Sequence, residues 1–227
     1  MKLGIISHHQ DSDLKKVKQM GLANVEFCIN GDDKTFLSNI DQVQKSLKTY
    51  GLEVLSIGRW GTIRVNTQGI VEQEFRVNEQ LIDACRQLGC PIYTTGVNYV
   101  EEMNYEDNIR LTLTYLKRLQ AYAATKGVKL AVNNCRWENY IVGPDTWDIV
   151  LRNVPGLGIK YDPSHAIYDL KNYLKELNDY AKHIVHIHLK GSLIVDSLRV
   201  DDPPAGLDMT NWKAFMSILY HHEYKGG

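Results

Sequence analysis

The sequence predicts an α/β fold, a TIM (β/α)8 barrel that lacks its eighth strand within this chain. Short apolar runs alternate with amphipathic stretches along all 227 residues, and strict alternation of this kind implies parallel strands covered by helices. Glycines follow several of the amphipathic stretches and lead into β-rich runs, as expected where a helix ends and a strand begins. About seven such units fit into the chain, one fewer than a complete barrel of ~250 residues needs.

The strands are expected where short apolar runs lie between turn residues. The first two, 3–7 (LGIIS) and 24–29 (NVEFCI), enclose a helical pattern at 12–20 that ends at Gly21. The later strands are expected at 53–57, 91–96, 128–133, 157–162 and 184–190. The later helices are expected near 34–50, 70–89, 104–126, 144–153, 169–181 and 210–222, with Gly51, Gly89 and Gly127 closing the first three. Residues 191–210 are the least regular stretch and are expected to form a long loop on the active face.

A doubly wound open sheet is the competing topology for the same alternation. No GxGxxG motif follows the first strand, so a Rossmann dinucleotide site has no support. The composition is 44% hydrophobic and 23% charged, which suits one sizeable core. We therefore expect a single barrel domain over 1–227, incomplete at its C-terminus because another strand is due just where the chain reaches Gly227.

Charge and cysteine content narrow the class of protein. The formal net charge is −1, which gives no electrostatic footprint for a nucleic acid or an anionic membrane. The four cysteines form no CxxC pair and suit free thiols in a reducing compartment. No signal-peptide core follows Met1, and no apolar run approaches the ~20 residues of a membrane span. We expect a cytoplasmic protein.

Side-chain alternation along the strands predicts which residues point into the barrel. In 24–29 the apolar Val25 and Phe27 should meet the helices, and Glu26 then points inward. The same reasoning on the last three strands gives a polar set that converges on one interior: Glu26, Asn133, Lys160, Asp162, His186, His188 and Lys190. Barrel interiors are normally filled by branched apolar residues, and buried charges are costly unless paired or used. This set therefore marks the candidate site.

Asn133, Asp162 and His188 are the candidate metal ligands, because they end adjacent strands that lie only ~5 Å apart. Oxygen ligands suit hard divalent cations, and imidazole suits transition metals. In the competing interpretation Asp162 only caps the turn that Asp-Pro opens, and His188 is a core histidine with a satisfied ring. His186 should lie deeper and have a structural role, as a donor behind the ligands.

Two lysines affect the electrostatics of the same interior. Lys160 should lie below Asp162, where it either forms a buried ion pair or supplies positive charge in place of a metal. With an amide at Asn133, the pocket is about two charges more positive than a two-carboxylate site, which disfavours a divalent cation. Lys190 could hold a substrate carboxylate, a phosphate or an enolate oxygen, or could be an exposed lysine at a strand end.

Other polar and aromatic residues follow strand ends and suit contacts with a substrate. His8, Trp60 and Arg136 follow the first, third and fifth strands, and His165 closes the sequence Asp-Pro-Ser-His. A tryptophan there can stack on a sugar face. Loops carry such residues in many proteins, so each alone is a weak signal. Comparable positions hold Arg59, Asn98 and Trp137.

Several segments match a known set of motifs, namely GLANVE at 21–26, GVKLAVNN at 127–134, DPSH at 162–165, HIHLK at 186–190, PAGLD at 204–208 and Asn211-Trp212. Over essentially its whole length the chain resembles the sugar phosphate isomerase/epimerase superfamily, the xylose isomerase-like TIM barrels also named AP endonuclease family 2. The resemblance implies one divalent metal (Mn, Zn, Co or Mg) held by Glu, Asp, His and Glu on strands five to eight. It also implies proton exchange by the two glutamates at adjacent sugar carbons.

Position by position, the resemblance retains Asp162 and His188 as metal ligands and His165 as a pocket residue. The first glutamate is Asn133 here, which can ligate through its carbonyl oxygen but cannot act as a base. The second glutamate would lie beyond Gly227, and the family's Lys-Asp after the histidine is Lys190-Gly191. We expect metal binding to be weakened or lost through Asn133 and Lys160.

The expected function is an isomerase or epimerase of carbohydrate metabolism that transfers a proton next to a carbonyl. Its partner is a small keto-sugar, polyol or sugar acid, with Lys160, Lys190 and His188 as catalytic groups and with Glu26, His8, Trp60, Arg136 and His165 contacting the substrate. A metal-free dehydratase or lyase and a degenerate, non-catalytic sugar-binding barrel are the alternatives. An abasic-site endonuclease is disfavoured, because the chain lacks a basic surface and a large His/Glu cluster. A homodimer is among the states that such barrels form.

Overall fold

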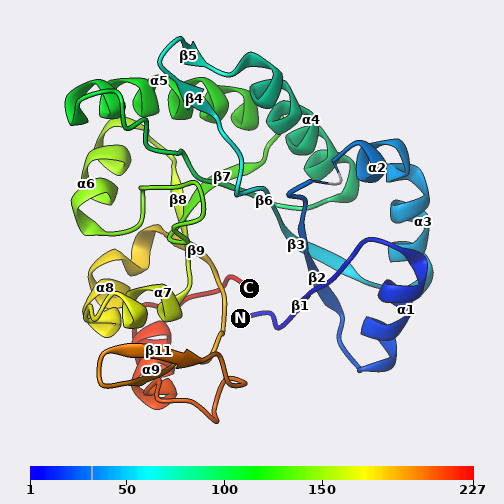
Figure 1. Cartoon of the computed structure of the whole chain (residues 1–227). Coiled ribbons are helices and arrows are strands. Elements are labelled where there is room, and N and C mark those ends of the chain that lie inside the picture. Colours follow the sequence, from blue (N-terminus) through cyan, green and yellow to red (C-terminus); the bar gives the residue numbers. More distant parts are fainter. Residues whose placement is uncertain (32) are drawn as a thin grey trace.

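The computed structural model describes residues 1–31 and 33–227. Seven parallel strands form one sheet in the order β1-β2-β3-β6-β7-β8-β9 (Figure 1). Their bounds are β1 (Ile5–Ile6), β2 (Asn24–Cys28), β3 (Glu53–Gly58), β6 (Ile92–Thr95), β7 (Lys129–Asn133), β8 (Gly158–Tyr161) and β9 (Ile184–Ile187). Each expected apolar run contains a strand, although β3 extends one residue past its run, and every neighbouring pair is parallel. The predicted (β/α) barrel class is confirmed, with seven strands in the parallel sheet that the described residues form.

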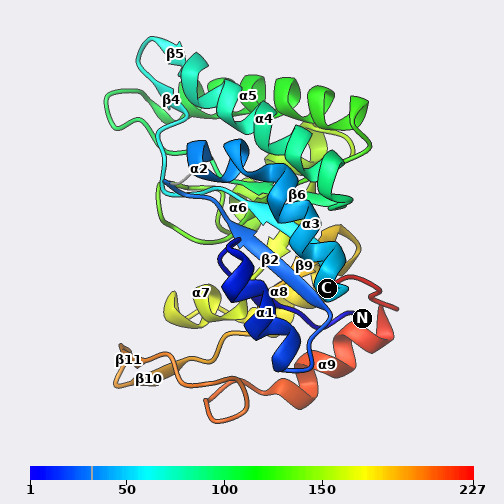
Figure 2. The ribbon, with the colours of Figure 1, turned by 90° about the vertical axis from the view of Figure 1, so that its right-hand side faces the viewer.

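Helices surround the sheet on its outer side (Figures 1 and 2). They are α1 (Asp11–Gln19), α2 (Asp33–Ser38), α3 (Ile40–Tyr50), α4 (Glu72–Leu88), α5 (Tyr105–Thr125), α6 (Pro144–Asn153), α7 (Pro163–Tyr168), α8 (Tyr173–Tyr180), the 3₁₀ turn η1 (Ala181–His183) and α9 (Trp212–His221). The single helix expected at 34–50 is wrong: Asn39 separates α2 from α3, and its amide donates back to the Thr35 carbonyl over 2.8 Å. Such a side-chain bond competes with the helical ladder.

The glycines expected to end helices do so. Gly51 and Gly89 cap α3 and α4 in the left-handed conformation, with φ of 62° and 70°. The next amide then donates back into the last turn, from Leu52 to the Leu47 carbonyl over 2.9 Å. This bond satisfies a carbonyl that the helix leaves free and turns the chain toward the following strand.

The core lies between the outer face of the sheet and the helices. Val25 and Phe27 of β2 are fully buried, as alternation predicts for residues that face the helices. Phe27 packs edge-to-face on Phe36 of α2, with ring centroids 5.8 Å apart. Because the apolar side chains of β2 fill this layer, Glu26 between them has to point to the opposite side, into the barrel.

Two hairpins interrupt the alternation, and neither was predicted. β4 (Val65–Asn66) pairs with β5 (Gly69–Ile70), and β10 (Leu193–Val195) pairs with β11 (Leu198–Asp201). The long loop expected at 191–210 is therefore partly wrong, because Asp196 and Ser197 form a two-residue turn with φ of 50° and 65°. Two positive φ values are what a tight hairpin turn needs. The β10–β11 hairpin projects from the molecule in Figure 2.

The two ends of the chain meet beside the two edge strands of the sheet (Figure 1). The Lys2 amide donates to the Gly226 carbonyl, and the Ile187 amide of β9 donates to the Gly227 carbonyl, each over 2.9 Å. Residues 226 and 227 thus lie between β9 and the segment that enters β1. Among the described residues, no helix combines the length and apolar character that a membrane span requires.

Asp208 holds the segment between β11 and α9 through several hydrogen bonds. We expect the stability that these bonds provide to be lost at low pH. Its carboxylate accepts from the Ser192 amide over 3.0 Å and from the Trp212 indole over 2.6 Å. Partial burial raises the pKa of Asp208, but bonds from Thr210, Trp212 and neighbouring amides outweigh it and lower the pKa to about 2. A lowered pKa stabilises the fold above the unfolded value near 4 and loses that effect as the pH falls toward 2.

We therefore expect Asp208→Asn to lower the melting temperature by roughly 2–4 °C at pH 6 and by much less at pH 2.5. Circular dichroism melts of both proteins at the two pH values measure the difference. A melting-temperature difference that does not change with pH would contradict the assignment.

Candidate functional site

Glu26 joins two histidines across the interior of the barrel. The Oε2 atom of Glu26, on β2, lies 2.7 Å from Nε2 of His186 and 2.7 Å from Nε2 of His188, both at the end of β9. β2 and β9 are not neighbours in the sheet, so the contact crosses the interior. Glu26 and His186 are 4% and 3% exposed. One carboxylate oxygen thus serves two imidazoles in a place where apolar side chains normally pack.

The electrostatics favour an ionised Glu26 beside a neutral His188. Burial raises the pKa of the Glu26 carboxyl, but His188, His186 and Lys160 outweigh it and hold the pKa well below its usual range. Burial lowers the pKa of His188, and the Lys160 ammonium lowers it further against the opposing effect of Glu26. A neutral His188 then donates from Nε2 to the carboxylate, which leaves its Nδ1 atom as a lone-pair acceptor.

Glu26, His186 and His188 could hold a metal ion, since one ligand atom from each lies within 4.8 Å of the others. Two imidazoles and one carboxylate are a donor set that suits zinc and other transition metals. Two buried atoms of the same cluster, Oε1 of Glu26 and Nδ1 of His186, have no hydrogen-bond partner among the described residues. Buried polar atoms without partners are rare and point to a missing ligand or water. The donor set therefore fits a metal.

Asp162 serves two purposes with its two carboxylate oxygens. Oδ1 accepts from the amide and the hydroxyl of Ser164, over 2.9 and 2.6 Å, and so caps α7. Oδ2 lies 3.7 Å from Nε2 of His165 and 3.9 Å from Nδ1 of His188. The two interpretations of Asp-Pro-Ser-His that the sequence left open are thus compatible. Burial lowers the pKa of His165 against the opposing effect of Asp162, so a second neutral imidazole faces this carboxylate.

Lys160 points into the same interior and stacks on Trp60. Its Nζ lies 4.5 Å from the Trp60 ring centroid, and the residue is 4% exposed. Within the part of the chain that the structure describes, this ammonium has no hydrogen bond or ion pair, so the buried pair with Glu26 does not form. Gly58 makes room for the tryptophan, because a Cβ there would lie 2.0 Å from the indole ring.

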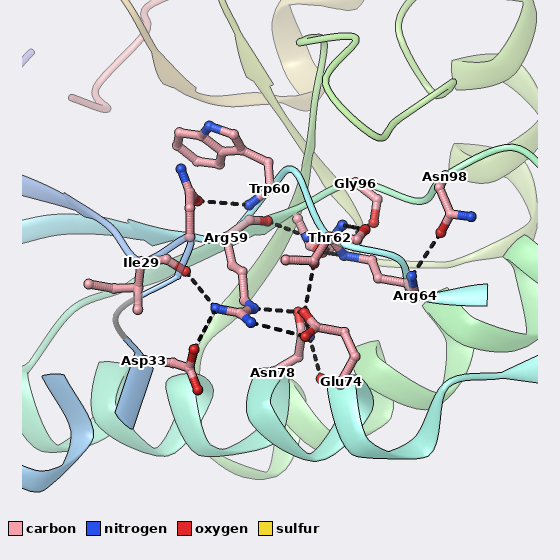
Figure 3. Close-up of polar contacts among 12 residues, drawn as sticks. Ile29, Asp33, Arg59, Trp60, Thr62, Arg64, Glu74, Asn78, Gly96 and Asn98 are labelled. Carbon is pink, nitrogen blue, oxygen red and sulfur yellow. Dashed lines mark hydrogen bonds and ion pairs between the residues drawn. The ribbon is translucent and has the colours of Figure 1, made fainter. Parts of the chain in front are cut away.

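A buried ionic network holds the loop that carries Trp60 (Figure 3). Arg59 donates from Nε and Nη2 to the Glu74 carboxylate, over 2.7 and 3.0 Å, and from Nη1 to the Ile29 carbonyl over 2.9 Å. Asp33 lies 3.2 Å from the same Nη1. The Trp60 amide in turn donates to Asn30 over 3.1 Å. Trp60 is therefore positioned by the network around Arg59 and by its own amide bond to Asn30.

The remaining sequence candidates lie apart from this cluster. Asn133 is buried, but its amide donates to the Thr95 carbonyl over 2.9 Å and its oxygen accepts from the Cys135 amide over 3.0 Å. Lys190 pairs with Asp202 over 2.9 Å. Because β9 ends at Ile187, alternation no longer sets the direction of Lys190. Arg136 forms an ion pair with Asp169. His8 lines a separate cavity beside α1.

Two contributions escaped the sequence analysis. Asn134 clamps the ends of β7 and β8: its amide donates to the Asp162 carbonyl over 2.8 Å, and its oxygen accepts from the Asp162 amide over 2.9 Å. His186, expected only behind the ligands, is itself one of the gathered metal donors. The expected ligand set of Asn133, Asp162 and His188 has His188 in common with the group that the geometry gathers. The His-x-His spacing was the available signal, because residues two apart on a strand share a face.

A cavity of about 590 Å³ opens beside the histidines. Glu26, His186 and His188 line its inner end, and Lys190 and Asp202 line it farther out. The volume is in the range of small-molecule sites. Lys160 and Asp162 flank the histidines outside this lining, so the cluster borders the cavity on one side only.

Comparison with known proteins places this geometry in a family. The model of a protein family described as "Xylose isomerase-like TIM barrel" matches residues 14–226 of this chain. The chain belongs to the xylose isomerase-like TIM barrel family. No match is found among curated protein sequences.

Several solved structures are similar to this chain over nearly its whole length. A 3-keto-D-glucoside 4-epimerase from E. coli superposes with a TM-score of 0.79 at 18% identity, over 100% of this chain and 89% of that one. A D-psicose 3-epimerase from Clostridium cellulolyticum gives 0.81 at 13%, over 100% and 83%. A probable 3-DHS dehydratase from Bacillus anthracis gives 0.73 at 14%, over 99% and 90%. At such identities the likeness establishes a shared fold, and the neighbours span more than one type of reaction.

Proposed function

We propose that this chain is a sugar isomerase or epimerase that moves a proton next to the carbonyl of a small keto-sugar, polyol or sugar acid. The observation that carries the proposal is the buried cluster of Glu26, His186, His188, Asp162 and Lys160 beside a cavity of about 590 Å³. The cluster offers proton acceptors and one positive charge within a few ångströms, where a stable barrel needs neither. Membership in a family whose solved structures include sugar epimerases supports the same substrate class.

In this proposal His188 accepts the proton. Its Nε2–H donates to Glu26, so Nδ1 carries the lone pair, and Glu26 stabilises the imidazolium that forms. In an isomerase the same imidazolium returns the proton to the neighbouring carbon, whereas in an epimerase a second group on the opposite face of the carbon has to supply the proton. Lys160 balances the negative charge that develops on the substrate oxygen, an effect that is large in a buried site. Trp60 lies with Lys160 on the side of the cluster away from the cavity and would hold the apolar face of a sugar there. Lys190 and Asp202 would contact polar groups at the outer end of the cavity.

A divalent metal would be an alternative occupant of the same cluster, and His188 would then be one of its ligands instead of the proton acceptor. Glu26, His186 and His188 would hold it, and when bound it supplies Lewis-acid polarisation of a carbonyl oxygen. We expect about one transition-metal ion per chain after equilibration with Mn, Co or Zn and removal of excess metal. Inductively coupled plasma mass spectrometry measures it on wild type, His186→Gln, His188→Gln and a matched control, His222→Gln at the end of α9. Ions retained equally by all four proteins would contradict the assignment.

A metal-free dehydratase or lyase is the second candidate, and Lys160 favours it. Its buried ammonium lies over the Trp60 ring and, among the described residues, forms no hydrogen bond or ion pair, so it is available to stabilise negative charge without a metal. Elimination would begin with the same proton abstraction and would end in loss of a β-hydroxyl. The two functions therefore differ in the product and not in the first step.

One experiment separates the two functions. A panel of ketoses, aldoses and sugar acids is incubated with the protein in D₂O, with and without the metal found above, and analysed by NMR and mass spectrometry. Isomerisation or epimerisation gives a product of unchanged composition with deuterium next to the carbonyl, whereas a lyase gives a product that has lost water. Lys160→Met should lower either rate by roughly 10²–10³-fold. If the protein produces neither deuterium exchange nor a product under any of these conditions, both functions are excluded.

A further inference from the structure

Trp137 is an exposed aromatic side chain at the rim of the barrel. It follows β7 in the connection to α6 and is 54% exposed. One part of its ring rests on the backbone of Gly61, where a Cβ would lie only 2.3 Å from the indole. Gly61 has φ of 73°, which an L side chain rarely adopts. The contact thus depends on a glycine in the loop that also carries Trp60.

The segment around Trp137 is held on both sides. Arg136 forms an ion pair with Asp169, and its Nε lies 3.1 Å from both carboxylate oxygens. Asn139 donates to the carbonyls of Asn133 and Cys135, each over 2.9 Å. Glu138 has φ of 46°, a costly conformation for a residue other than glycine. A large exposed ring on a segment fixed by this many bonds loses little freedom on binding.

The two tryptophans form consecutive parts of one wall. Trp60 folds back on Gly58 and over Lys160, while Trp137 rests on Gly61, one residue beyond Trp60. The inner ring belongs to the proposed reacting centre. The two rings rest on different glycines, and among the described residues no ring contact joins them, so the outer ring presents a separate surface of the same kind.

We propose that Trp137 forms an outer subsite that stacks on the second ring of a glycoside, so that the substrate class is a disaccharide or other glycoside rather than a free monosaccharide. The proposal rests on the proposed function. Sugar rings carry patches of C–H groups, which are attracted to the negative face of an aromatic ring. A tryptophan at the rim adds affinity only for a ligand that extends past the inner site. It would therefore favour a glycoside with two rings over a monosaccharide.

Isothermal titration calorimetry tests the subsite with D-glucose and D-fructose against sucrose, maltose and cellobiose, which contain the same rings. At least one disaccharide should bind about tenfold tighter than its component monosaccharides. Trp137→Ala and Trp137→Leu should abolish that advantage and change monosaccharide affinity less than twofold, whereas Trp137→Phe should retain part of it. Leucine still covers Gly61, so it separates stacking from support of the loop. Tyr220→Ala, an exposed aromatic on α9, is the matched control.

The outcomes distinguish the subsite from the proposed function. Monosaccharide binding or turnover without any gain for disaccharides would overturn the subsite alone. Equal losses for both ligand sizes in Trp137→Leu would also overturn it, since that result indicates support of the loop. Binding of no saccharide by the wild-type chain would overturn the subsite and the proposed function together.

Discussion

Glu26→Gln is expected to lower turnover by roughly two to four orders of magnitude while the chain remains folded. The glutamine amide has the size of the carboxylate, but it carries no charge, and an NH₂ group replaces one of the two oxygens. It cannot accept from both Nε2 atoms at 2.7 Å with the same strength, and it no longer stabilises an imidazolium at His188. A rotated imidazole would also present the wrong nitrogen to the substrate.

Steady-state kinetics on the substrate found by the D₂O screen measure this effect, with circular dichroism to confirm folding. Glu176→Gln is the matched control, because Glu176 is also a buried carboxylate, 7% exposed, but accepts from the Tyr161 hydroxyl over 3.1 Å on the helix side of β8. The control should retain turnover within about threefold, as expected of a substitution outside the site. Wild-type kcat in Glu26→Gln would show that Glu26 only fills the interior.

Much of the fold could be predicted because its signals are local. Apolar runs, glycines after helices and alternation along β2 depend on residues next to one another, and alternation correctly turned Glu26, Lys160 and His188 toward one interior. The β10–β11 hairpin also had a local signal that was overlooked, since two β-branched runs flank Asp196-Ser197. The division of α2 from α3 depended on one side-chain bond from Asn39, which no periodicity contains.

The site was harder to predict because its geometry depends on contacts between distant residues. Asn133 was expected to face a metal, but partners on β6 and in the next loop fix both ends of its amide. The sequence left Lys190 open between a substrate contact and an exposed lysine at a strand end; β9 ends before it, and its ammonium pairs with Asp202 beside the cavity. The distance between Glu26 and the two histidines depends on closure of the sheet, because β2 and β9 are far apart in sequence and meet only across the interior.

Arg59→Met is expected to give the largest loss of stability, about 3–5 kcal/mol in the free energy of unfolding. Arg59 is 5% exposed, and its removal leaves the carboxylates of Glu74 and Asp33 without their cation. Burial raises the pKa of Glu74, and the bonds from Arg59 and Thr62 outweigh it and lower that pKa. Without Arg59 the carboxylate must therefore either remain charged at a high cost or take up a proton.

The double variant Arg59→Met with Glu74→Leu tests the cause of this loss. If the loss comes from an uncompensated charge, removing the second charge as well should restore a large part of it, because replacing a buried ion pair by apolar residues is often close to neutral. Urea unfolding of the wild type, both single variants and the double variant gives the coupling energy. Simple additivity of the two single losses would instead mean that Arg59 acts through packing. Since Arg59 and Trp60 are consecutive, the double variant also tests whether the network positions the tryptophan: we expect KM to rise even where stability is recovered.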